Sequence, residues 1–143
     1  MLVSASNPAN FPFAEARPAA SATQTVVRVL ALTYGIVPLV AGLDKFTNLL
    51  TNGEAYLAPS LVKMLPFSAH DFMLVVGIIE IIAGALVLLR PRVGAWVVMA
   101  WLIAIGLTLV ASGHYFDVAV RDFALAVGAW ALARLSATTH LEA

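Results

Sequence analysis

One long apolar stretch constrains the fold more than any other feature of the sequence; it extends from Asp71 to Arg90 (DFMLVVGIIEIIAGALVLLR). Between Phe72 and Leu89 every residue except Glu80 is apolar or glycine, which as a helix is long enough to cross a hydrocarbon layer of roughly 30 Å. An ionisable side chain in such a helix costs about 2.5–3.5 kcal/mol on insertion scales, so it is rarely left facing lipid. Glu80 therefore needs a charged partner, a bound proton or a polar cavity inside the protein.

The composition of the whole chain is that of a membrane protein. Hydrophobic residues make up 62% and charged residues 11% of the sequence, whereas a soluble domain carries about 25% charged residues. The formal net charge is zero, so there is no basic surface for a nucleic acid. The sequence has no cysteine, which excludes thiol redox chemistry and thiolate-bound zinc or iron–sulfur clusters on this chain. No metal and no covalently bound cofactor is expected, and a redox role requires a bound cofactor or a partner subunit.

Apolar segments predict four membrane spans, over residues 26–43, 72–89, 93–111 and 118–135. Short connections between the last three spans make neighbouring helices antiparallel. We therefore expect an all-α fold in which residues 25–136 form a membrane-embedded antiparallel four-helix bundle. The connection over residues 46–70 is polar, and its middle is suited to a short interfacial helix or a re-entrant turn.

The two ends of the chain are expected on the cytoplasmic side. Residues 1–24 contain three prolines and many small polar residues, which predicts a partly extended leader, and residues 137–143 form a short polar tail. With four spans, the basic residues of one side are Arg17, Arg28, Arg90, Arg92 and Arg134. The positive-inside rule places that side in the cytoplasm, and the expected location is the bacterial cytoplasmic membrane.

Polar residues gather at one level, in the outer half of the predicted bundle. Glu80 lies about 12 Å from the outer face, and Arg121 and Asp122 lie roughly 5–6 Å from it, at 1.5 Å of rise per residue. The other members are Asp44 and Lys45 at the end of the first span and His114 and Asp117 in the outer turn. The inner half of the bundle has almost no charge, so the candidate site lies near the outer face.

Two interpretations of these charges remain open. Arg121 or Lys45 can reach Glu80, and arginine is the stronger choice because it can form a bidentate pair with a carboxylate. Asp122 points about 100° away from Arg121, so the two do not both face Glu80. Alternatively, the charges only hold helices together. An average polar contact between helices in a membrane stabilises the fold by about 0.6 kcal/mol. His114 is more readily explained as a solvated turn residue than as a metal ligand.

The sequence around these charges resembles that of a known family. The first span ends in VAGLDKF (residues 40–46), the second contains GIIEIIAGALVLL (residues 77–89), and the fourth begins with Arg121-Asp122 after a short aromatic turn. Over residues 26–135 this pattern resembles the DoxX-like family of small four-helix integral membrane proteins. The positions to which the resemblance carries over are Gly42, Lys45, Glu80, Gly84 and Arg121.

The resemblance implies a function in a redox complex, because the family is named for a subunit of a thiosulfate:quinone oxidoreductase. In this interpretation the chain is a membrane subunit with quinone as the candidate cofactor and with other membrane or redox subunits as partners. Glu80 is the candidate proton-exchanging group, Arg121 is its electrostatic partner, and the remaining ligand-binding candidates are Lys45, Asp122, Asp44 and His114.

Two other functions remain open. One is a non-enzymatic accessory subunit that stabilises a larger membrane assembly. The other is a small transporter, which is disfavoured because the sequence shows no inverted repeat and its inner half offers no polar path. Whether the chain is an enzyme is left open by the sequence.

Overall fold

The computed structural model describes residues 17–139, with side chains from residue 20 onwards, and in this range the chain forms helices and no strand. The elements are α1 (Arg17–Thr47), the 3₁₀ helix η1 (Gly53–Tyr56), α2 (Pro59–Met64), α3 (Ala69–Leu89), α4 (Pro91–Ser112) and α5 (Phe116–Thr139). The predicted all-helical fold is confirmed. Three helices are long and apolar enough to cross a membrane, namely α1 over Ala20–Thr47, α3 and α4, whereas α5 is not among them.

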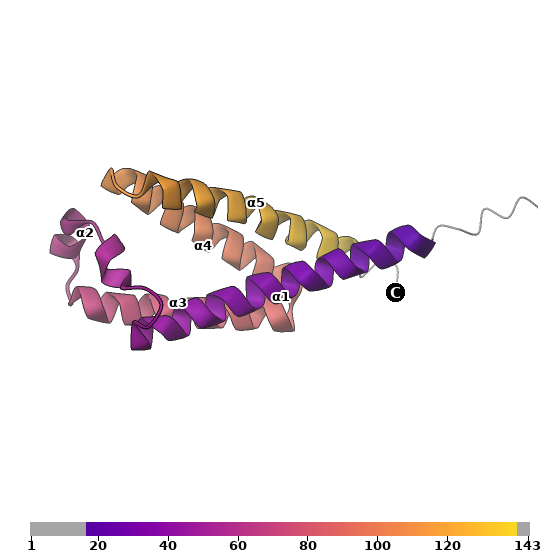
Figure 1. The fold of residues 1–143 in the computed structure, drawn as a ribbon, viewed down its shortest axis with the longest axis horizontal. Helices are drawn as coiled ribbons and strands as arrows, with labels where there is room; N and C mark the ends of the chain where they lie inside the picture. Colours follow the sequence, from indigo (N-terminus) through magenta and orange to yellow (C-terminus); the bar gives the residue numbers. More distant parts are fainter. Residues whose placement is uncertain (1–16, 140–143) are drawn as a thin grey trace, which may run out of the picture.

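The long helices form two closely packed pairs, α1 with α3 and α4 with α5 (Figure 1). Smaller contacts join the pairs, mainly between α3 and α4 and between α1 and α5. The pairs diverge toward the end of the molecule that carries α2, here called the α2 end (Figure 1). The C-terminal ends of α1 and α4 and the N-terminal ends of α3 and α5 lie at this end.

The helix boundaries follow local sequence signals. The hydroxyl of Ser68 accepts the backbone N–H of Asp71, which caps the start of α3. Arg90 is the single residue between α3 and α4, and α4 starts with Pro91, which is well suited to the first turn of a helix. Gly113 ends α4 in the left-handed conformation with a φ of 73°.

The structure corrects the expected leader and tail. α1 already begins at Arg17, so residues 17–24 of the predicted leader are helical; Pro18 lies in the first turn, where it is tolerated, and alanines follow it. At the other end α5 continues to Thr139, so residues 137–139 of the predicted tail are helical. Residues 1–16 and 140–143 lie outside the described part of the chain. Within the 46–70 connection, the short helices η1 and α2 form.

The buried core lies in the half of the molecule away from the α2 end. Its largest fully buried side chains are Val87 of α3 and Leu132 of α5, and they pack among alanines of α3, α4 and α5. Many large apolar side chains on the outward faces of the helices are exposed, for example Leu32, Ile82, Leu107 and Val127. Helices that are apolar on both their inner and outer faces are typical of a protein surrounded by lipid.

Candidate functional site

Two glycine contacts set the packing of α1 against α3. Gly35 faces Gly84 and Gly42 faces Gly77, so the same spacing on two antiparallel helices brings glycine opposite glycine twice. A Cβ at position 42 would lie 2.5 Å from the carbonyl oxygen of Gly77, and a Cβ at position 84 would lie 2.5 Å from that of Gly35. Ordinary contacts need about 3.5 Å, so only glycine allows this approach. The contacts fix which residues of α1 lie opposite which residues of α3.

This register brings Lys45 to Glu80. The Nζ atom of Lys45 lies 2.8 Å from Oε2 of Glu80, and the two side chains are only 18% and 12% exposed. A Cβ at position 77 would lie 3.1 Å from the Cβ of Lys45, so Gly77 leaves room for the base of the lysine side chain. Lys45 is close to the end of α1, and its side chain extends along α3 toward the middle of the molecule. It therefore neutralises Glu80 instead of reaching outward to the interface.

Arg121, the favoured partner of Glu80 in the sequence analysis, does not form this pair. Its side chain is exposed, whereas the neighbouring Asp122 is half-buried and close enough to Glu80 for the two carboxylates to repel each other. The 100° turn between consecutive helical residues explains the difference, because only one of the two can face the interior. Arg121 lies near the start of α5, so its long side chain can extend to the interface. The inward-facing group is thus Lys45, Glu80 and Asp122, with one positive and two negative charges when ionised.

One buried polar atom of the described residues near this level lacks a partner, the indole Nε1 of Trp101 on α4, whereas Oε2 of Glu80 has the Lys45 ammonium 2.8 Å away. The backbone of Val87 closely approaches Gly94. Glu80 lies two helical turns before Val87 on α3, and Trp101 lies two turns after Gly94 on α4. Both residues are therefore about equally far from this contact, toward the α2 end. The Glu80 carboxylate, paired with Lys45, and the unpaired indole N–H of Trp101 thus belong to one level of the helix pair.

Asp44 has a different role from its neighbour Lys45. Its carboxylate accepts the backbone N–H groups of Leu49 at 2.9 Å, Leu50 at 2.7 Å and Thr51 at 3.0 Å. Asp44 is only 8% exposed, and these three bonds hold the chain as it turns away from the end of α1. Its carboxylate is therefore used for the local fold and is poorly placed to bind a ligand.

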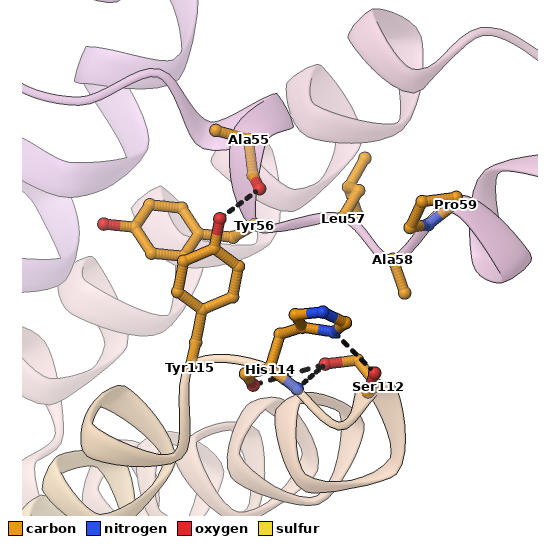
Figure 2. Close-up of a pocket in the computed structure, with 8 residues that line it drawn as sticks. All are labelled: Ala55, Tyr56, Leu57, Ala58, Pro59, Ser112, His114 and Tyr115. Carbon is orange, nitrogen blue, oxygen red and sulfur yellow. Dashed lines mark hydrogen bonds between the residues drawn. The ribbon is translucent and has the colours of Figure 1, made fainter.

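His114 lies apart from the charged group, in the turn between α4 and α5. Figure 2 shows its ring directed from this turn toward the segment 55–59 across a hollow of about 260 Å³. Its Nδ1 atom lies 2.9 Å from the carbonyl oxygen of Ser112. Asp117, which follows in the first turn of α5, is exposed. Among the described residues, no three His, Asp or Glu side chains lie together as a metal site would require.

Two parts of this arrangement were not predicted from the sequence. Trp101 has the appearance of a packing or interfacial residue in the sequence, and only the structure reveals its unpaired N–H. The signal for the glycine contacts was present, because glycines seven residues apart occur in both helices, at 35 and 42 and at 77 and 84.

Comparisons of the chain with protein-family models, with curated proteins and with solved structures give no match. The function is therefore argued below from the site itself, and the resemblance to the DoxX-like family supports it only as an expectation from the sequence.

Proposed function

We propose that this protein is an integral membrane subunit of a redox complex and that it binds the headgroup of a lipid-soluble quinone beside Lys45 and Glu80. The observation that carries the proposal is the mostly buried ion pair of Lys45 and Glu80, with the unpaired, buried indole Nε1 of Trp101 at the same level on α4. Buried polar groups in proteins are almost always hydrogen-bonded, so the unpaired indole N–H points to a ligand or water beside it.

The chemistry of a quinone suits these groups. A quinone carbonyl oxygen needs hydrogen-bond donors, which the indole N–H of Trp101 and the ammonium of Lys45 provide. A quinol hydroxyl needs an acceptor and, on oxidation, a group that takes its proton; the carboxylate of Glu80 provides both. Asp122 adds a second carboxylate within electrostatic range of Glu80, so the group holds two carboxylates and one ammonium.

The proposal includes a membrane arrangement. α1, α3 and α4 have the length and apolarity of spanning helices, and we propose α5 as the fourth span because it packs along α4 over its length. Both termini then lie on the cytoplasmic side of a bacterial cytoplasmic membrane, with the α2 end outside. This is the four-helix architecture of the DoxX-like family, of which we propose the chain to be a member.

A second function, that of a non-enzymatic accessory subunit, is favoured by a different observation. The Lys45–Glu80 pair connects α1 and α3, which already pack closely through their glycines. The Asp44 carboxylate accepts hydrogen bonds from three backbone N–H groups and so has a structural role. In this alternative, the charges stabilise the helix pair, and the exposed apolar faces contact other subunits of a membrane assembly.

A purification with a matched pair of variants separates the two functions. The chain is isolated gently from its native membrane, and mass spectrometry identifies bound lipids and proteins. Quinone binding predicts stoichiometric quinone and a redox partner with the wild type, and loss of the quinone with Glu80→Gln while the variant remains folded. Asp117→Asn serves as the control, because it makes the same chemical change on an exposed side chain at the same end of the molecule. Lower stability of Glu80→Gln, with no quinone bound to the wild type, would instead support the accessory function.

A further inference from the structure

We propose that the hollow between the segment 55–59 and the α4–α5 turn is a second binding site, which takes a small phenol through the ring of His114. This site lies at the α2 end and shares no residue with the Lys45–Glu80 group, so it does not rest on the function proposed above. Its volume of about 260 Å³ is sufficient for a single aromatic ring with small substituents.

The walls of the hollow are held in place by several contacts. The hydroxyl of Tyr115 donates a hydrogen bond of 3.0 Å to the carbonyl oxygen of Ala55, which ties the turn to the opposite segment. The rings of Tyr56 and Tyr115 lie side by side with their centroids 4.8 Å apart (Figure 2). Ser112 fixes the turn from within, since its hydroxyl accepts the backbone N–H of His114 and donates to the carbonyl oxygen of Leu109. The site is therefore formed before any ligand arrives.

The backbone of Tyr115 supports a binding role for this turn. Its φ of 59° lies in the left-handed region, which a bulky side chain rarely adopts. Such strain persists only where surrounding contacts impose it, and it occurs preferentially at ligand sites. The hydrogen bond of the Tyr115 hydroxyl to Ala55 holds the aromatic ring against the hollow.

The hydrogen bonding of His114 determines what kind of ligand fits. The Nδ1 atom lies 2.9 Å from the carbonyl oxygen of Ser112, which can only accept, so Nδ1 carries the proton. In the neutral ring Nε2 is then an acceptor, and because His114 is exposed it is open to solvent and to a ligand in the hollow. The ligand must therefore donate a hydrogen bond.

The remaining walls determine the rest of the ligand. Leu57, Ala58 and Pro59 offer mainly apolar surface opposite the His114 ring, and the two tyrosine rings offer aromatic surface (Figure 2). Aromatic rings pack favourably on such surfaces, edge to face or offset. A planar ring that carries one hydroxyl provides both the hydrogen-bond donor for His114 and the apolar surface for these walls. A charged or strongly polar molecule provides only the donor.

The test uses ¹⁹F NMR on the full chain in detergent micelles, with 4-fluorophenol as the probe and 4-fluoroanisole as its control. The two molecules differ in the hydroxyl, which anisole replaces with a methoxy group that cannot donate. We expect a saturable shift of the fluorine resonance with 4-fluorophenol, and binding about tenfold weaker or absent with 4-fluoroanisole. Equal saturable binding of both probes would overturn the proposal.

Three variants locate the site. His114→Ala, which changes an exposed turn residue, should abolish the saturable shift, whereas His70→Ala, at another exposed histidine of the same end, should leave it unchanged. Glu80→Gln should also leave it unchanged. If Glu80→Gln removes the shift and His114→Ala does not, the phenol binds in the membrane-embedded group and the hollow is not its site. The quinone function and this second site can therefore fail separately.

Discussion

Replacement of Gly84 by alanine is the most direct test of how α1 and α3 are held together. The new Cβ would lie 2.5 Å from the carbonyl oxygen of Gly35 and 3.0 Å from the backbone nitrogen of Leu39. Both are backbone atoms of α1, so neither can rotate out of the way. The helices must separate by about 1 Å to restore an ordinary contact distance of about 3.5 Å.

Two effects of opposite sign decide the outcome. Alanine is favoured over glycine inside a helix by about 1 kcal/mol, which would stabilise the variant. Overpacking costs about 1–3 kcal/mol, and a gap of 0.5–1 Å removes roughly a quarter to a half of each contact energy along the interface. Because α1 and α3 share one of the two largest interfaces of the fold, we expect the second effect to prevail. The free energy of unfolding should fall by about 1–2 kcal/mol.

The assay is unfolding of the protein in mixed micelles by titration with sodium dodecyl sulfate, followed by circular dichroism. Gly53→Ala is the matched control, because its new Cβ would meet only the flexible end of Met73, with Sδ at 3.0 Å. This control should stay within about 0.5 kcal/mol of the wild type. A Gly84→Ala protein that is as stable as the wild type, or more stable, would refute the argument that glycine contacts position α1 on α3.

The same titration checks two further predictions. Asp44→Ala should cost about 1–2 kcal/mol and speed proteolysis after α1, because three backbone N–H groups lose their acceptor; Asp117→Ala, at an exposed carboxylate, should change neither stability nor cleavage. Tyr34→Phe should cost about 0.5–1.5 kcal/mol, because its hydroxyl donates a hydrogen bond of 2.7 Å to the carbonyl oxygen of Leu125 on α5. Tyr56→Phe, at an exposed ring, is the control, and equal losses in the two tyrosine variants would show that the bond to α5 contributes nothing.

The helices themselves could be predicted from the sequence, because their signals are local. The apolar stretches and the Arg90-Pro91 turn predicted α3 and α4 to within a few residues of their observed ends. The predicted first span starts at residue 26, whereas α1 begins at Arg17, because Pro18 is tolerated in the first turn of a helix. Similarly, residues 137–143 are predicted as a tail, whereas α5 continues to Thr139.

The partner of Glu80 could not be predicted in the same way. Counting residues along the spans placed Lys45, Glu80 and Arg121 in one half of the bundle, and both basic side chains are long enough to reach a carboxylate. Which of them does so depends on the rotation of each helix about its axis and on its register against its neighbours. The rotation of α5 turns Asp122 inward and leaves Arg121 exposed, and no local sequence pattern specifies that rotation.

The register of α1 against α3, in contrast, can be traced to residues that seemed to matter only for packing. Because Gly35 meets Gly84 and Gly42 meets Gly77, a slip of one turn would place a larger side chain opposite each of these glycines. The register therefore has little freedom, and it also fixes the position of Lys45 along α3. Since Gly77 also leaves room for the base of the lysine side chain, the ammonium extends inward and reaches Glu80. In this protein the glycines thus determine the electrostatics: they select which cation lies beside the membrane-embedded carboxylate.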